Sequence, residues 1–293
     1  MRKLLSILFI AFLFVQTSFA LSITRRGVLP EFTDWHFYSV NLPQLVYVEG
    51  GSFDMGGADG DSDERPLHRV TVDEYYIGAY EVTQGLWYDV MGQNPSYFQG
   101  SCSAYSTSWR ELPVENVSWD DCQAFLDRLN SLRSTLLPAD VQNWKFRFPT
   151  EAEWEYAARG GRNSRNTYSG SNNIDEVAWY WDNSGKGLSA GGFNNSNKQQ
   201  THPVGTKRGC PLGSAYIYDM TGNVWEWCLD WYDSSYYSRS PQRNPCNTNR
   251  ASRRVLRGGG WNYNAQYCRV ANRTLNYPDY GYLYYGLRLV LAP

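Results

Sequence analysis

Residues 218–227, YDMTGNVWEW, hold the combination of side chains that characterises the whole chain. Small and turn-forming residues separate two carboxylates, Asp219 and Glu226, and two tryptophans flank the second carboxylate. Trp225 and Trp227 are large apolar side chains, and we expect both to pack in the core. The stretch therefore predicts aromatic packing close to a pair of carboxylates.

The composition of the 293 residues extends this pattern to the rest of the chain. Aromatic residues make up 16% of it, and 26 Gly and 13 Pro add many turn formers. This composition predicts an irregular, loop-rich globular protein and argues against a helical bundle or a coiled coil. Apolar residues are 42% and charged residues 19%, so a core can form and extensive disorder is not expected. A formal charge of −2 gives no reason to expect nucleic acid or an acidic membrane as partner.

Residues 1–20 have the layout of a secretory signal peptide, with two basic residues, an apolar run over residues 4–15 and a small-x-small cleavage site. The apolar run is short for a transmembrane helix, although an uncleaved N-terminal anchor is the alternative. We therefore expect export to the periplasm, the cell envelope or the extracellular space, with no stable membrane span after cleavage. Residues 21–44 are expected to form an extended lead-in to a single domain over residues 45–293.

Three helices are predicted from their N-terminal signals. Residues 83–91 begin with a threonine and are followed by a glycine, which indicates one short helix. Ser118 with Asp121, and Thr150 with Glu153, have the spacing of capping boxes. Apolar residues follow each box at helical spacing, so a helix is expected after each of them.

Two runs of residues predict β-strands. Residues 45–47 begin one strand, which a Gly-Gly pair ends, and residues 68–76, HRVTVDEYY, alternate well enough for a second strand. Val70 and Val72 would then face the same side. The Gly/Asp-rich segment 56–65 lacks the register of an EF-hand calcium loop, so we expect a solvated turn there.

Eight sequence blocks follow one another in order between about residues 45 and 292. They are Met55-Gly56 with Glu64-Arg65-Pro66 and His68; Tyr80-Glu81-Val82-Thr83; Pro113-Val114 with Val117-Ser118-Trp119; residues 148–157 (FPTEAEWEYA); Pro203-Val204-Gly205; residues 218–227; Arg257-Gly258-Gly259-Gly260-Trp261; and Gly286-Leu287-Arg288-Leu289. Together they resemble the formylglycine-generating enzyme family, also called the sulfatase-modifying factor family. The resemblance implies an α+β protein with a compact C-type-lectin-like fold, in which helices and strands are short and few and aromatic packing is extensive.

The resemblance also implies where an oxidase of this family would hold copper. Active formylglycine generators resemble one another in having two cysteines after a glycine-rich turn and an aromatic residue, because Cu(I) prefers soft thiolates. Here the aromatic residue is Trp261, Tyr263 stands at the first cysteine position, and Cys268 fits the second on an ungapped alignment. Aligned instead on the Arg-x-Ala-x-Arg element at residues 269–273, Cys268 matches neither position. We therefore do not expect a copper pair, and Cys268 is the remaining catalytic candidate.

The resemblance further implies a structural calcium ion at the opening stretch. Matched residue by residue, Asp219 and Glu226 would supply carboxylates, and Gly222 and Val224 would supply backbone carbonyls. Calcium prefers six to eight hard oxygen ligands, so this set is chemically suitable. The alternative is that Glu226 pairs with an arginine and Asp219 caps a turn.

All of the six cysteines follow the predicted signal peptide, and an even number in an exported chain first indicates disulfides. The sequence alone leaves their pairing open. Because the resemblance implies that the two blocks next to Cys228 and Cys268 lie near each other in the core, it implies a Cys228–Cys268 bridge. The simplest local pairing of the other four is Cys102–Cys122 and Cys210–Cys246.

Three roles are compatible with these residues. The first is an exported noncatalytic member that binds a protein, peptide or glycan in a groove lined by Trp179, Trp181, Trp261 and Tyr263, for which core packing is the alternative. The second is a protein-modifying oxidase that converts a sulfatase cysteine to formylglycine, and the third is a subunit of an envelope assembly. The incomplete cysteine pair favours the first and the third. An iron site of the His-x-x-x-His-x-Glu type and a G-x-S-x-G hydrolase have no support, because neither pattern occurs.

Overall fold

The computed structural model describes residues 42, 44–58, 60–99, 108–161, 164–185 and 199–293. The predicted signal peptide, nearly all of the predicted lead-in and Cys102 lie outside the described residues. Within those segments, no helix is long and apolar enough to cross a membrane.

The strands of the described segments form two four-stranded and two two-stranded sheets. The first sheet has the order β1 (Leu45–Val48), β4 (Tyr75–Gly78), β12 (Val290–Ala292) and β5 (Lys145–Arg147). The second has the order β10 (Arg273–Asn276), β9 (Arg254–Arg257), β8 (Trp225–Trp231) and β11 (Tyr285–Gly286). The two hairpins are β2 (Gly51–Met55) with β3 (His68–Val72), and β6 (Cys210–Leu212) with β7 (Ala215–Ile217).

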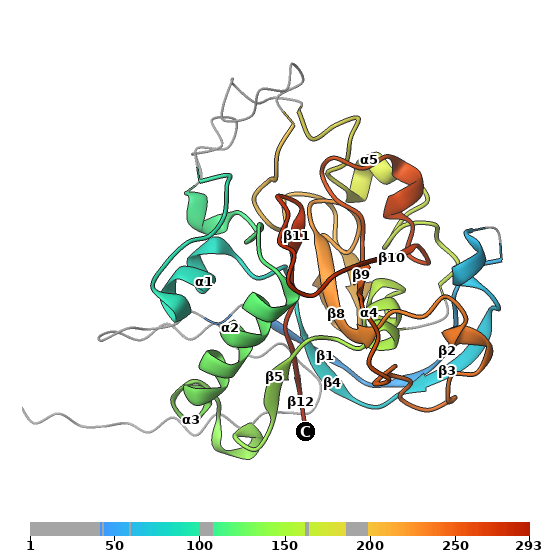
Figure 1. Cartoon of the computed structure of the whole chain (residues 1–293), viewed down its shortest axis with the longest axis horizontal. Coiled ribbons are helices and arrows are strands. Elements are labelled where there is room, and N and C mark those ends of the chain that lie inside the picture. Colours follow the sequence, from blue (N-terminus) through green and yellow to red (C-terminus); the bar gives the residue numbers. More distant parts are fainter. Residues whose placement is uncertain (1–41, 43, 59, 100–107, 162–163, 186–198) are drawn as a thin grey trace, which may run out of the picture.

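The helices are short and lie around these sheets. They are α1 (Gln84–Met91), α2 (Trp119–Ser131), α3 (Arg133–Leu136), α4 (Glu151–Ala158) and α5 (Ile174–Val177). Single 3-10 turns occur at Ser62–Glu64, Trp109–Glu111, Ala139–Val141, Tyr236–Ser238 and Ala265–Cys268. Helices α1, α2 and α3 lie on one side of the sheets, and the β2–β3 hairpin lies on the opposite side (Figure 1). This arrangement confirms the predicted α+β class with few, short elements.

The three predicted helix starts are confirmed. The side chain of Thr83 caps α1. Ser118 and Asp121 complete a capping box at α2, and Thr150 and Glu153 complete another at α4. In each box the side chains satisfy backbone N–H groups that the first helical turn leaves without a partner, so these helices begin where the sequence placed them.

The predicted strand over residues 68–76 is wrong in its extent, because it is two strands in different sheets. Val70 and Val72 are buried on the same side of β3, as expected. Continued alternation would bury Glu74 and expose Tyr75, but the chain breaks after β3, and Tyr75 is fully buried in β4. Burying an aromatic ring instead of a carboxylate is the physical reason for the break.

Two large hydrophobic clusters fill the interior of the described chain, one beneath α1 and α2 and one between α4 and the β2–β3 hairpin. Trp225 and Trp227 are buried in the first cluster, as the sequence predicted. The indole nitrogen of Trp227 donates to the carbonyl of Val117 at 3.1 Å. Both rings therefore bury apolar surface, and the indole nitrogen of Trp227 retains a hydrogen-bond partner.

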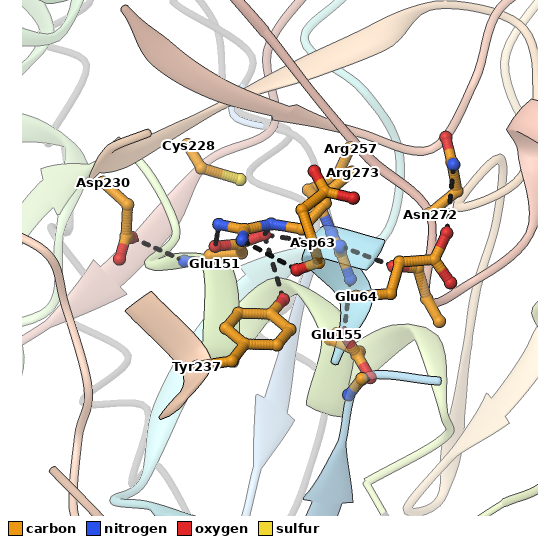
Figure 2. A network of polar contacts seen from close by, with 12 residues as sticks. Asp63, Glu64, Glu151, Glu155, Cys228, Asp230, Tyr237, Arg257, Asn272 and Arg273 are labelled. Atoms are coloured by element: carbon orange, nitrogen blue, oxygen red, sulfur yellow. Dashed lines mark hydrogen bonds and ion pairs between the residues drawn. The ribbon is translucent and has the colours of Figure 1, made fainter. Parts of the chain in front are cut away.

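A buried network of charged side chains joins α4 to β9 and β10 (Figure 2). Glu151 accepts hydrogen bonds from Nε and Nη2 of Arg273 at 2.8 and 2.7 Å. Glu155 accepts from Arg257 and from Arg159. Removing one member of such a pair leaves an uncompensated charge in the core, which is strongly destabilising. The network therefore makes the position of α4 depend on both strands.

The segment 56–65 is not a solvated turn throughout, so that prediction was partly wrong. Glu64 is fully buried, and its carboxylate accepts two hydrogen bonds from Arg269 at 2.8 and 2.6 Å. Arg269 lies far along the chain from this segment, and the sequence gives no local signal for the pair. This ion pair joins the glycine-rich segment 56–65 to the segment 269–273.

Candidate functional site

The turn after β9 carries the chain from the core to one face of the protein. Gly259 has a φ of 83°, and a Cβ atom there would lie 2.4 Å from Sγ of Cys268, so only glycine fits. Trp261 follows this turn, and its indole nitrogen donates to the carbonyl of Leu283 at 2.8 Å. Its ring packs edge-on against Phe98, with 5.3 Å between centroids. Trp261 is only 4% exposed, so its ring is buried below the surface of the protein.

Tyr263 lies between the buried ring of Trp225 and a group of tyrosine rings. It is partly buried, and its ring makes edge-on contacts with Trp225, Tyr267 and Tyr284 at centroid distances of 5.3, 5.7 and 5.4 Å. Tyr284 in turn stacks on Tyr282 at 5.4 Å. Burial raises the pKa of Tyr263, so its hydroxyl remains protonated at neutral pH. The rings therefore form one continuous group.

Trp181 lies beside this group, because its backbone nitrogen donates to the carbonyl of Tyr263 at 3.0 Å. The side chain of Trp181 is 44% exposed, and those of Tyr267 and Tyr282 are 38% and 42% exposed. We call Trp181, Tyr263, Tyr267, Tyr282 and Tyr284 the aromatic surface. Ring faces with phenol hydroxyls suit a ligand that is partly apolar and partly polar.

Two of the four aromatics predicted to bind a ligand are buried. Trp179 is 8% exposed and stacks on His202, with centroids 3.7 Å apart and planes at 5°. Burial lowers the pKa of His202 to about 4, so the stacked imidazole is neutral at pH 7. The structure thus exposes Trp181, leaves Tyr263 partly exposed, and buries Trp179 and Trp261.

The remaining members of the aromatic surface were not predicted individually. Tyr267, Tyr282 and Tyr284 do not belong to any of the family blocks, and none of them follows a helix or strand period. Tyr267 lies outside any tyrosine-rich run, but local density could have found Tyr282 and Tyr284, because residues 277–285, YPDYGYLYY, contain five tyrosines. So many tyrosine side chains in one short segment cannot all be buried in the core, so some of them must reach the surface.

The predicted calcium ligands lie deep in the protein. The carboxylate of Glu226 accepts from Nη2 and Nε of Arg288 at 2.7 and 3.0 Å, and from the indole nitrogen of Trp154 at 2.7 Å. Oδ2 of Asp219 accepts from the backbone nitrogen of Gly205 at 2.6 Å. These contacts correspond to the alternative reading, in which Glu226 pairs with an arginine and Asp219 holds a turn.

One feature of this cluster nevertheless suits a cation. Oδ1 of Asp219 is buried without a hydrogen-bond partner among the described residues. Glu81 is also buried nearby, so three carboxyl groups, those of Glu81, Asp219 and Glu226, surround the single guanidinium of Arg288. Burial raises the pKa of Asp219 to about 6, and burial together with the other two acids raises that of Glu81. Asp219 therefore fits a cation ligand, whereas Glu226 is already satisfied; within the described segments, no three acidic, His or Cys side chains converge as a metal site.

The predicted Cys228–Cys268 bridge is absent, and both residues are buried free thiols. Cys228 packs with Val255 and Met220 in the second hydrophobic cluster, whereas Cys268 packs with Ala178 and Tyr180 in a separate small cluster. The two family blocks are neighbours in the fold, but their cysteines point into different packing regions. Cys122 and Cys246 are also thiols, so neither the Cys102–Cys122 nor the Cys210–Cys246 pairing is formed.

Cys268, the remaining catalytic candidate, is enclosed. It is fully buried, and burial raises the pKa of its thiol to about 12. A thiol in this environment is protonated at neutral pH and is a poor metal ligand and nucleophile. Its cluster, formed by Cys268, Ala178 and Tyr180 in the described chain, holds no second thiol. These residues do not fit a Cu(I) ion that needs two thiolates.

Comparison with known proteins is consistent with this geometry. The family profile described as "Sulfatase-modifying factor enzyme 1-like domain" matches residues 34–293. The chain is 42% identical over 247 residues to "Chaperone protein LppX" of Paenibacillus barcinonensis, covering 74% of this chain and 78% of that protein. It is 34% identical over 289 residues to "Formylglycine-generating enzyme" of Streptomyces coelicolor, covering 80% and 84%.

Among solved structures, "Treponema denticola variable protein 1" is similar, with a TM-score of 0.71 and 32% identity over 85% of this chain and 95% of that one. The profile covers all four of these sheets and the residues of the aromatic surface. The order of the sequence blocks, the fold and the matched profile agree, so this chain belongs to the sulfatase-modifying factor, or formylglycine-generating enzyme, family.

Proposed function

We propose that this chain is an exported, noncatalytic binding member of its family and that the aromatic surface holds a protein or peptide ligand. The observation that carries the proposal is a group of exposed tryptophan and tyrosine rings on a buried support. Trp225, which is nearly fully buried, packs against Tyr263. The indole nitrogen of buried Trp261 holds the backbone at Leu283, between Tyr282 and Tyr284. Rings that are already ordered lose little conformational entropy when a partner binds.

The chemistry of the surface favours a protein over a smaller ligand. Tyr and Trp supply large contact areas with few rotatable bonds, and asparagine side chains add adaptable hydrogen bonding, as in antibody binding sites. Asn262 and Asn264 flank Tyr263 in the chain. A relative named as a chaperone protein supports a role in binding other proteins. Export rests on the predicted signal peptide.

The alternative is catalysis, and relatives named as formylglycine-generating enzymes are its support. The surroundings of Cys268 argue against it, since the thiol is buried and its cluster in the described chain holds no second thiol. A glycan ligand is the other alternative within the binding class, because aromatic rings also stack on sugars.

The test compares peptide and glycan arrays probed with purified residues 21–293. We expect peptide ligands, and we expect a Tyr267→Ala/Tyr282→Ala variant to lose about thirtyfold or more in affinity, since truncating a hot-spot residue costs about 2 kcal/mol or more. Tyr216→Ala is the matched control, because Tyr216 is 53% exposed on the β6–β7 hairpin. Equal binding by all three proteins would refute the proposed surface, and binding to glycans alone would reassign its ligand.

A copper assay separates binding from catalysis. Incubation of purified protein and copper with a Cys-containing sulfatase peptide should leave the peptide cysteine unmodified, as judged by mass spectrometry. Formylglycine in that peptide, lost in a Cys268→Ser variant, would establish the oxidase instead.

A further inference from the structure

Arg254, in β9, carries a positive charge that the described residues leave without a carboxylate partner. Its guanidinium contacts the rings of Trp119 and Trp231, 3.8 and 3.6 Å from their centroids. Nη1 donates to the carbonyl of Leu229, and Nε is buried with no hydrogen-bond partner among the described residues, so a ligand from solvent would meet the terminal nitrogens. The more deeply buried arginines differ, since a carboxylate pairs with each of Arg159, Arg257, Arg273 and Arg288.

Two more arginines without a salt bridge in the described chain lie close to Arg254 in the sequence. Arg250 is exposed, and Arg253 stacks on Tyr277 with its guanidinium carbon 4.8 Å from the ring centroid. Nη2 of Arg253 also donates to the hydroxyl of Tyr277 at 3.2 Å. Tyr277 is 39% exposed and packs edge-on against Tyr280, which is 49% exposed. We call Arg250, Arg253 and Arg254 the arginine patch.

The charge of Arg254 is retained at neutral pH although its position is unfavourable for it. Burial lowers the pKa of Arg254 to about 10, and Asp230 and Asp120 are the acids that act against this effect. Neither acid forms a salt bridge with Arg254 in the described chain, and both oxygens of Asp230 accept backbone hydrogen bonds, from Glu151 and Asn247. An external anion would add to the partial compensation that these two acids supply.

The two tryptophan rings restrict the direction from which that anion can approach. They occupy the faces of the guanidinium, so only its edge can meet a ligand. A carboxylate binds an arginine edge in the plane of the guanidinium and needs no room above or below it. The ligand proposed for the aromatic surface is a protein or peptide, and its side-chain carboxylates are anions that can bind in this way.

We propose that the arginine patch binds the side-chain carboxylates of an acidic peptide segment, and that this segment belongs to the ligand held by the aromatic surface. This inference rests on the proposed function and adds the chemical class of the partner. The tyrosine-dense segment 277–285 connects the two regions, since Tyr277 contacts Arg253 at one end and Tyr284 contacts Tyr263 at the other. The chain has a formal charge of −2, so attraction of an acidic partner depends on this local patch and not on the overall field.

The experiment measures fluorescence anisotropy of a labelled deca-glutamate peptide with residues 21–293, and uses deca-glutamine as the neutral probe. We expect deca-glutamate alone to bind, and we expect affinity to fall as salt rises from 20 to 300 mM. Arg253→Gln should weaken binding about tenfold, and Arg250→Gln/Arg253→Gln should weaken it further. Arg254→Lys keeps the charge but loses the planar fork, so it should also weaken binding while the melting temperature shows that the protein is folded.

The matched control is Arg243→Gln, which removes the same charge from an exposed arginine that pairs with Asp73. Its affinity for deca-glutamate should equal that of the wild type. The proposal is overturned if deca-glutamate does not bind, if Arg243→Gln weakens binding as much as Arg253→Gln, or if a heparin octasaccharide binds where deca-glutamate does not. The Tyr267→Ala/Tyr282→Ala variant separates the two proposals. It should retain deca-glutamate binding, so loss of array ligands and loss of this probe report on different regions.

Discussion

Replacing Glu115 by Gln should change how the stability of the protein depends on pH. Glu115 is fully buried, and its Oε1 accepts a hydrogen bond from the backbone nitrogen of Phe98 at 2.8 Å. Oε2 has no partner among the described residues. Burial raises the pKa of Glu115 from an ordinary value of 4.5 to about 8. The carboxyl group is therefore neutral in the folded protein at pH 7 and charged in the unfolded chain.

The sign and size of the effect follow from this difference. Below pH 4.5 the group is protonated in both states, and its contribution to the unfolding free energy is fully present. Between pH 4.5 and 8 the unfolded chain binds fewer protons than the folded protein, so the free energy of unfolding falls by about 1.4 kcal/mol per pH unit. From pH 5 to pH 8 the loss is on the order of 4 kcal/mol. Glutamine does not titrate, so Glu115→Gln lacks this loss while keeping an acceptor for Phe98.

The assay is urea unfolding of wild type and Glu115→Gln, followed by tryptophan fluorescence at pH 5, 6, 7 and 8. We expect the variant to gain stability relative to wild type with each step in pH. The pH 5 measurement is the internal control for the fixed cost of the amide, because the Glu115 carboxyl is then largely protonated in the folded protein. A difference between the two proteins that stays constant from pH 5 to pH 8 would show that Glu115 is ionised in the folded state.

Two further predictions concern the buried charges. Arg273→Met should lower the free energy of unfolding by about 3–5 kcal/mol, because it leaves Glu151 without its main partner, and the double variant Glu151→Gln/Arg273→Met should recover part of that loss in urea unfolding. If calcium binds Asp219 and Glu226, it should raise the melting temperature. At one hundred times the dissociation constant, the stabilisation is equivalent to about 2.7 kcal/mol. The melting temperature of Glu226→Gln should not change when calcium is added. An equal rise in melting temperature in both proteins would show that calcium does not bind at this site. If calcium does not change the melting temperature of the wild type, Arg288 remains the partner of Glu226.

The sequence by itself determined where the capped helices begin and to which family the chain belongs. The hydroxyl and carboxylate of a capping box act within three residues, so Ser118 and Thr150 marked the beginnings of α2 and α4 correctly. The order of the glycine- and tryptophan-rich blocks identified the fold, and the burial of Trp225 and Trp227 followed from their size. These features depend on neighbours in the chain or on the nature of one side chain.

Only the tertiary structure decided which polar and aromatic groups meet. Glu226 and Arg288, Glu64 and Arg269, and Glu151 and Arg273 are each separated by 62 residues or more, and a sequence gives no direction for a side chain over that distance. The cysteines illustrate the same limit, because adjacent family blocks did not bring the thiols of Cys228 and Cys268 into one packing region. Trp179 and Trp181 lie only two positions apart, but one stacks on His202 in the interior and the other is exposed. Burial of each ring depends on what the rest of the chain packs against it, and that is settled only when the sheets assemble.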